Sequence, residues 1–181
     1  ATCKNITIQL DATGNASIVA GDINNGSSDA CGIASLTASN TSFNCSNVGP
    51  NTVTLTVVDN NGNTSTCNST VTVQDNVAPV ATCKNITIQL NSSGNATITA
   101  ADINNGSSDA CGIASLVASK TSFNCSNVGA NTVTLTVTDN NGNTSTCNST
   151  VTVQDNVAPI ALCKNITIQL NSSGNATITA A

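Results

Sequence analysis

Apolar and polar residues alternate along several short segments of the chain, which is the pattern of a half-buried β-strand. The alternation is clearest over residues 53–57, where Val53, Leu55 and Val57 are separated by threonines. Residues 6–10 and 67–73 show it too, and residues 16–20 and 33–38 show it more weakly. No segment carries a helical period. We therefore predict six or seven short strands in the first eighty residues.

Turn residues separate these segments. Asp59-Asn60-Asn61-Gly62-Asn63 lies between two alternating runs, and Asn-Gly tolerates the positive φ of a tight hairpin. We expect Asp59 and Asn63 to brace that turn.

The sequence repeats with a period of eighty residues, the most informative feature of the chain. Residues 1–80 and 81–160 align without gaps and differ at eleven positions, and a third copy begins at residue 161. Eighty residues suffice for a small autonomous domain. We predict one module over residues 1–76, a second over 77–156, and the N-terminal strands of a third over 157–181. Such similar copies indicate part of a longer array.

The amino-acid composition argues against several classes of protein function. The chain of 181 residues has a net charge of −5, no His, Met, Trp or Tyr, and two Phe; its acids are all Asp. Without His, Glu or Tyr, acid–base catalysis near neutral pH lacks its usual groups, and we expect no enzyme and no catalytic residue. Four scattered lysines do not favour nucleic-acid binding. No apolar run reaches the roughly 18 residues of a membrane span.

Each full repeat has four cysteines, which compensate for a thin core of small aliphatic residues. Four cysteines allow three pairings, and spacing does not choose between them. We favour Cys31–Cys45, which closes a short loop, and Cys3–Cys67, which ties the first strand to the last. The equivalent residues of the second repeat are Cys111, Cys125, Cys83 and Cys147, and Cys163 is left unpaired. A Cys₄ zinc site is the alternative, but no Cys-x₂-Cys pair is present. Disulfides predict an extracellular location.

The series Cys3, Asp29-Ala30-Cys31-Gly32, Asn47-Val48-Gly49, Thr52–Val57 and Asp59-x-x-Gly62-Asn63 resembles the hyalin repeat (HYR), an immunoglobulin-like extracellular module. The near-identical Thr/Asn-rich copies are similar to those of giant cell-surface proteins of Bacteroidota, including gliding adhesins of the SprB kind. The resemblance implies tandem immunoglobulin-like β-sandwiches, all-β and stapled by disulfides. It also implies a first-to-last-strand disulfide, in agreement with Cys3–Cys67. Lys4 stands where the family usually has Pro, and the common mid-domain Trp or Tyr is missing.

Oxygen-bearing side chains gather in the segment 22–29, and calcium takes six to eight oxygen ligands. The candidate calcium ligands are Asp22, Asn24, Asp29 and their copies Asp102, Asn104 and Asp109. The alternative is a loop of Asx turns with no metal. Asp75 and Asn76 lie between the repeats and are compatible with a joint calcium or with a plain linker. We expect no other cofactor.

The leading hypothesis is a stalk or filament segment of an extracellular, repetitive cell-surface adhesin, acting in surface attachment or gliding. Its partners would be neighbouring repeats, other copies in a filament, and surface glycans on some of the many Asn-x-Ser/Thr sequences. One alternative is a module that binds calcium, carbohydrate or ice through its threonine faces or Asp/Asn loops. Another is a self-assembling extracellular filament subunit.

Overall fold

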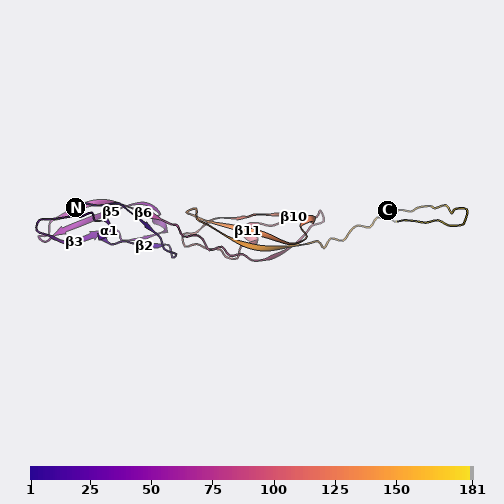
Figure 1. Cartoon of the computed structure of the whole chain (residues 1–181), viewed down its shortest axis with the longest axis horizontal. Helices are drawn as coiled ribbons and strands as arrows, with labels where there is room; N and C mark the ends of the chain where they lie inside the picture. The colour runs from indigo at the N-terminus through magenta and orange to yellow at the C-terminus, as the bar shows by residue number, and fades with distance from the viewer. Residues whose placement is uncertain (180–181) are drawn as a thin grey trace.

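The computed structural model describes residues 1–179 and shows two similar β-sandwich units arranged in line, followed by an extended segment (Figure 1). We call residues 1–80 unit 1 and residues 81–160 unit 2.

The two units contain the same elements in the same order. Unit 1 consists of β1 (Ile6–Gln9), β2 (Asn15–Ser17), α1 (Ala20–Ile23), β3 (Ile33–Ala38), β4 (Ser42–Asn44), the 3₁₀ turn η1 (Cys45–Asn47), β5 (Gly49–Asp59) and β6 (Thr64–Gln74). Unit 2 consists of β7 (Ile86–Gln89), β8 (Asn95–Thr97), α2 (Ala100–Ile103), β9 (Ile113–Ala118), β10 (Ser122–Asn124), η2 (Cys125–Asn127), β11 (Gly129–Asp139) and β12 (Thr144–Gln154). The expected module boundary at residues 76 and 77 falls between β6 and β7.

Each unit pairs a four-stranded sheet with a two-stranded one. In unit 1 the strand orders are β1-β6-β5-β3 and β2-β4, and unit 2 repeats them as β7-β12-β11-β9 and β8-β10. The first strand of each unit runs parallel to the last, and the other pairs are antiparallel. The predicted fold class, tandem immunoglobulin-like β-sandwiches stapled by disulfides, is confirmed.

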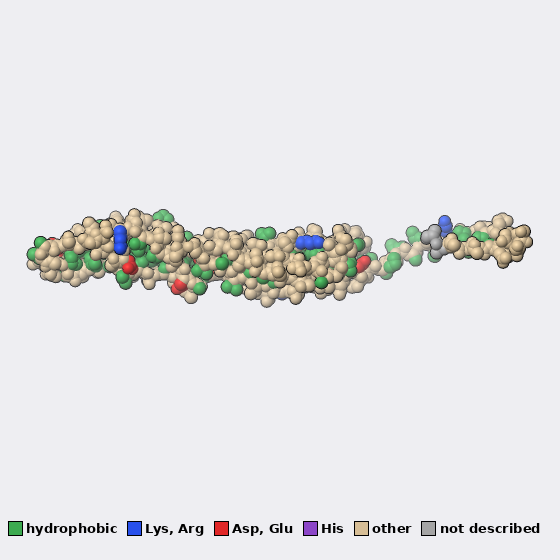
Figure 2. Space-filling model, viewed as in Figure 1, with side chains coloured by type: hydrophobic (Ala, Val, Ile, Leu, Met, Phe, Trp, Pro, Cys, Tyr) green, Lys and Arg blue, Asp and Glu red, His purple; other side chains and the backbone are tan. Residues whose placement is uncertain are grey.

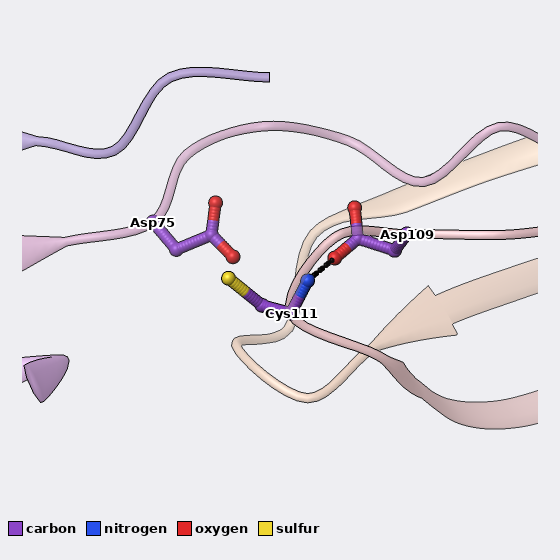
Figure 3. Close-up of side chains that lie close together, drawn as sticks. All are labelled: Asp75, Asp109 and Cys111. Atoms are coloured by element: carbon purple, nitrogen blue, oxygen red, sulfur yellow. Dashed lines mark hydrogen bonds between the residues drawn. The ribbon is translucent and has the colours of Figure 1, made fainter. Parts of the chain in front are cut away.

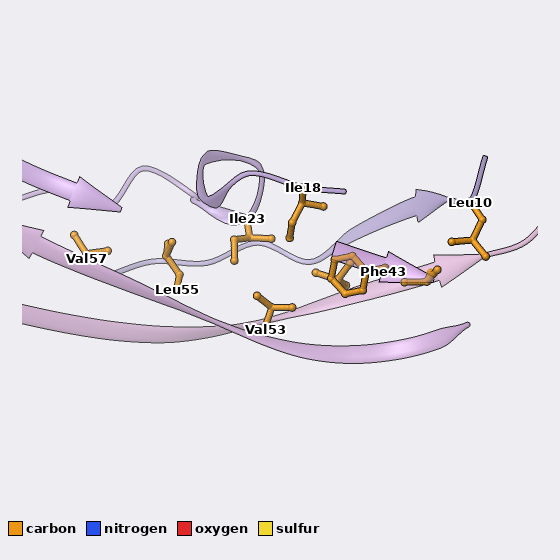
Figure 4. Close-up of a cluster of buried hydrophobic side chains, with 9 residues drawn as sticks. Leu10, Ile18, Ile23, Phe43, Val53, Leu55 and Val57 are labelled. Atoms are coloured by element: carbon orange, nitrogen blue, oxygen red, sulfur yellow. The ribbon is translucent and has the colours of Figure 1, made fainter. Parts of the chain in front are cut away.

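The core of each unit lies between its sheets and consists of aliphatic side chains around one Phe (Figure 4). The alternation of β5 places Val53, Leu55 and Val57 on the buried face. Phe43 from β4 closes the other side, and Ile23 is fully buried. The alternating positions thus predicted the inner face of the main sheet correctly.

A single helical turn, α1, departs from the prediction that no segment is helical. Its N-terminus is capped by Asp22, whose Oδ2 accepts a hydrogen bond of 2.7 Å from the main-chain N of Val19. One turn is too short to show a hydrophobic period, and burial of Ile23 holds it in place. Among residues 1–179, no helix has the length and apolarity to cross a membrane.

The segment 157–179 carries the sequence of a third repeat but contains no strand among its described residues. A turn persists, with the main-chain N of Asn171 donating to the oxygen of Asn175 at 2.9 Å. Ile166 and Ile168 are exposed, whereas their equivalents Ile86 and Ile88 pair with β12 and pack on the core. Strand formation here requires the last strand of the same unit. The last two residues of the predicted third module, 180 and 181, lie outside the described residues.

Candidate functional site: the joint between the repeats

A disulfide crosses the joint between the two units. Cys45 of unit 1 is bonded to Cys111 of unit 2, with their Cα atoms 5.2 Å apart and 66 positions separating them in the sequence. The linker of residues 75–80 is therefore accompanied by a second covalent connection.

This bond corrects the predicted pairs Cys31–Cys45 and Cys111–Cys125, which are wrong. Cys31 lies beside the β5–β6 hairpin, where the side-chain amide of Asn60 donates to its main-chain oxygen at 2.7 Å. Cys45 lies in η1, just before β5 begins. The two cysteines therefore lie at opposite ends of the eleven-residue strand β5. At roughly 3.3 Å per residue, a strand of this length spans about 33 Å. A disulfide requires Cα atoms within about 7 Å.

The other expected bonds are present. Cys3 is joined to Cys67, and Cys83 to Cys147, each pair having Cα atoms 5.8 Å apart. These bonds fasten the segment before the first strand of each unit to its last strand. Within residues 1–179 the unpaired cysteines are exposed: Cys31, Cys125 and Cys163.

Hydrogen bonds to main-chain atoms also stabilise the joint. Val80 and Ser108 form an isolated antiparallel bridge, with N–O distances of 2.8 and 3.0 Å. The hydroxyl of Ser145 donates to the main-chain oxygen of Pro79. These hydrogen bonds hold the linker against unit 2.

Gly14 gives the loop of unit 2 room to approach unit 1. Its φ is +76°, and a Cβ built on it would lie 3.2 Å from the Cβ of Ala110 and 2.7 Å from the Sγ of Cys45. A side chain at position 14 would therefore collide with the groups that form the joint.

The β11–β12 hairpin of unit 2 faces the joint, and Asp139 in it is buried. Its Oδ1 accepts from the main-chain N atoms of Asn141 and Asn143 at 2.8 Å, and its Oδ2 accepts from the Asn143 side chain at 2.8 Å. Burial raises the pKa of Asp139, but these hydrogen bonds outweigh it and leave the pKa below the ordinary 3.8. The predicted brace between Asp59 and Asn63 is present in the hairpin of unit 1.

Asp75 of the linker lies close to Asp109 and Cys111 of unit 2, with the ligand-type atoms of the three residues within 4.8 Å of one another (Figure 3). The Oδ1 of Asp75 accepts from the main-chain N of Val77 at 3.0 Å, whereas its buried Oδ2 has no partner. The Oδ1 of Asp109 accepts from the N of Cys111 at 2.7 Å. The sulfur of Cys111 is bonded to Cys45, so it is not a thiolate ligand. Two carboxylates supply few of the six to eight oxygens that calcium takes.

The candidate calcium ligands of the loops brace local structure. Asp22 caps α1, Asn24 accepts from the N of Ser27, and Asp29 accepts from the N of Cys31. In unit 2, Asp102 accepts from the N of Thr99 at 2.6 Å and Asn104 from the N of Ser107 at 3.0 Å. The bonds from Thr99 lower the pKa of Asp102, and Lys84 adds a smaller effect. Calcium binding at these loops stays a prediction.

One family model matches part of the chain. Residues 74–153, which comprise the joint and most of unit 2, match the family model of the HYR domain. A comparison with curated proteins gives no match.

Three of the solved structures that resemble the chain at low identity are the following. The protocadherin gamma B7 extracellular cadherin domains 1–4 have 12% identity and a TM-score of 0.39, with 85% of this chain and 50% of that one covered. The fibronectin(III)-like modules of Clostridium thermocellum CbhA have 10% identity and a TM-score of 0.32, with 90% and 96% covered. Titin domains I67–I69 have 7% identity and a TM-score of 0.36, with 84% and 64% covered. The chain thus spans half the length of the first of these structures.

Proposed function

We propose that the chain is a segment of an extracellular rod, the stalk or filament of a cell-surface adhesin, whose task is to transmit tension. The observation that carries this proposal is the disulfide between Cys45 and Cys111, which fastens one repeat to the next beside the linker. A joint held by two covalent connections resists both hinging and separation. The in-line arrangement of the units fits the same role (Figure 1).

The disulfides within each unit keep most of it out of the path of a pulling force. When the chain is pulled from its ends, the tension passes from Cys3 to Cys67 through sulfur. The 64 positions between them are then shielded, a hidden length of about 220 Å per unit at about 3.4 Å per residue. An unfolded unit would therefore lengthen little while its disulfide remained intact.

The surface also suits an exposed fibre. The charged side chains visible on the face shown in Figure 2 are few and widely spaced, and hydrophobic side chains are scattered among uncharged side chains and backbone. Disulfides persist outside the reducing cytosol, which supports an extracellular location. Attachment to a cell surface, a role in gliding, and an origin in Bacteroidota are narrower predictions that rest on the resemblance of the repeats.

Single-molecule stretching of the whole chain tests the proposal. Pulled between its termini under oxidising conditions, the chain should show no lengthening step near 220 Å; after full reduction, each unit should show one. The variant Cys31→Ser, which removes an unpaired thiol, should behave as the native chain does. Long steps in the oxidised protein would contradict a tension-bearing role for the disulfides.

The competing hypothesis, a module that binds calcium, carbohydrate or ice, predicts a measurable ligand. Isothermal titration calorimetry with calcium and with a panel of oligosaccharides tests it on the intact chain. Binding at micromolar concentration would favour this alternative over the stalk.

A further inference from the structure

The end of unit 1 that meets unit 2 acts as a socket, which we define by Gly14, Cys45, Asp75, Val77 and Pro79. The loop Asp109–Gly112 of unit 2 occupies it. Ala110 approaches Gly14, and Cys111 bonds to Cys45. The socket and the loop that fills it belong to neighbouring copies of one repeat.

Unit 2 carries the same socket at its far end, formed by Gly94, Cys125, Asp155, Val157 and Pro159. These residues are identical in type to those of the first socket. Their exposure differs, however, because no segment within residues 1–179 covers them.

Equivalent residues of the two sockets differ in burial. Asp75 is 6% exposed and Pro79 is buried, whereas Asp155 and Pro159 are both exposed. Cys45 is half-buried, whereas Cys125 is exposed. Beside Cys125 lies a hollow of about 680 Å³ that Gly94, Asp155 and Pro159 help to line. In the first socket Gly14, the equivalent of Gly94, lies against Ala110 and Cys111 of the docked loop, whereas the only such neighbour of Gly94 is Cys125 within residues 1–179.

The loop that fits such a socket is shaped before it docks. In unit 1 no second unit within residues 1–179 covers the loop Asp29–Gly32. The Oδ1 of Asp29 nevertheless accepts from the N of Cys31 at 2.8 Å, as the Oδ1 of Asp109 does from the N of Cys111 at 2.7 Å. Gly32 and Gly112 share a φ of +93°. The side-chain amides of Asn60 and Asn140 hold the loops identically, each donating at 2.7 Å to the oxygen of the loop cysteine. Docking therefore needs no rearrangement of the loop, which lowers its entropic cost.

We propose that the socket around Cys125 receives the Asp-Ala-Cys-Gly loop of a following repeat, and that Cys125 forms a disulfide with the cysteine of that loop. Cys31 forms the equivalent bond with a preceding repeat. The reaction consumes one disulfide oxidant such as oxidised glutathione: two thiols lose two protons and two electrons, one S–S bond forms, and two molecules of reduced glutathione are released. An array of these repeats is then cross-linked at every joint. The inference concerns the covalent structure of the array and does not depend on its adhesive role.

The test is a count of thiols in a lengthened chain. Appending a copy of residues 102–160 after Ala181 completes the third unit and adds three cysteines, copies of Cys111, Cys125 and Cys147. The native chain has three unpaired cysteines. After folding in a glutathione redox buffer, the lengthened chain should have two, Cys31 and the added copy of Cys125. Non-reducing peptide mapping should join Cys125 to the added copy of Cys111.

Four thiols would overturn the proposal, because Cys125 and the added loop would then both be free. A bond inside the third unit between the added copies of Cys111 and Cys125, or covalent dimers through Cys125, would overturn it equally. The variant Cys125→Ser of the lengthened chain is the matched control. It should have three thiols: Cys31 and the added copies of Cys111 and Cys125.

A second lengthened chain tests the same proposal without requiring the third unit to fold. Placing a copy of residues 81–160 before Ala1 supplies a socket for Cys31 and adds four cysteines. The proposal expects three thiols and a bond between Cys31 and the added copy of Cys125. Five thiols would count against it.

Discussion

The side-chain amide of Asn143 donates to two acceptors from different units: the Oδ2 of Asp139 in its own hairpin, at 2.8 Å, and the main-chain oxygen of Asp75 in the preceding unit, at 3.1 Å. One amide thus ties a turn to the linker. Its equivalent in unit 1, Asn63, braces only its own hairpin.

Asn143→Ala should therefore destabilise the protein more than Asn63→Ala. Both substitutions remove the hairpin brace, and only the first also removes the contact with the linker. We expect an additional loss of about 1 kcal/mol, typical of one hydrogen bond. Denaturant unfolding of both variants measures the difference, and equal losses would show that the contact with Asp75 contributes nothing.

Removal of the joint disulfide by Cys45→Ser should loosen the two units. Opening a ring of 66 positions costs up to about 4 kcal/mol by loop-closure entropy. Small-angle X-ray scattering should show a broader distribution of shapes, and the melting temperature should fall. Cys31→Ser is the control and should leave both unchanged; a comparable effect of this control would contradict the pairing.

Gly14→Ala should damage the joint, whereas Gly26→Ala should not. Both glycines have positive φ, +76° and +75°, so both substitutions introduce backbone strain of about 1 kcal/mol. At Gly26 the space is open, but at Gly14 the new methyl group meets Cys45 and Ala110. Thiol titration of the folded variants should detect two additional free thiols, those of Cys45 and Cys111, in part of the Gly14→Ala protein only.

Acid should weaken the β5–β6 and β11–β12 hairpins. Side-chain and main-chain hydrogen bonds from Asn63 lower the pKa of Asp59, and the bonds to Asp139 lower its pKa despite burial. A carboxyl group whose pKa is lower in the folded than in the unfolded protein stabilises the fold when the pH is above its unfolded pKa. The contribution is complete above the unfolded value near 3.8 and is lost as the pH falls through the folded pKa.

Thermal melts between pH 6 and pH 2 measure this dependence. In Asp139→Asn the melting temperature should start lower and fall less steeply below pH 4. An equally steep fall in that variant would assign the acid sensitivity to other groups.

Asp75→Asn should stabilise the joint when no divalent cation is present. The buried Oδ2 of Asp75 has no partner and lies near Asp109, so the native residue places two carboxylates together. Asn retains the Oδ1 that accepts from Val77 and removes one charge. We expect the melting temperature to rise by a few degrees, consistent with about 1 kcal/mol. If calcium raises the melting temperature of the native chain above that of the variant, the joint is a cation site instead.

The sequence predicted the strands better than the connections between units. The threonine–valine alternation of β5 and the Asn-Gly turn depend on neighbouring residues, and local patterns report them directly. The helical turns α1 and α2 were missed because four residues give no period, although Thr99 and Asp102, three positions apart at the start of α2, are a capping signal.

The joint could not be predicted in the same way. Short separation favoured Cys31–Cys45, yet β5 carries these residues to opposite ends of the unit, and the partner that meets Cys45 comes from the next repeat. The length of β5 was the usable signal, since eleven extended residues cannot return within disulfide range. The burial of Asp75 depends likewise on the neighbouring unit and leaves no local trace.

The disulfide between Cys45 and Cys111 has a consequence for how such a gene can change. The bonded positions correspond to Cys45 and Cys31 of a single eighty-residue period, so one copy supplies both halves of the connection. Unequal recombination between near-identical copies that inserts or deletes whole periods keeps every sulfur matched. A shift by any other number of codons would leave a cysteine facing the wrong neighbour. The chemistry of the joint thereby favours changes in the number of repeats by whole eighty-residue periods.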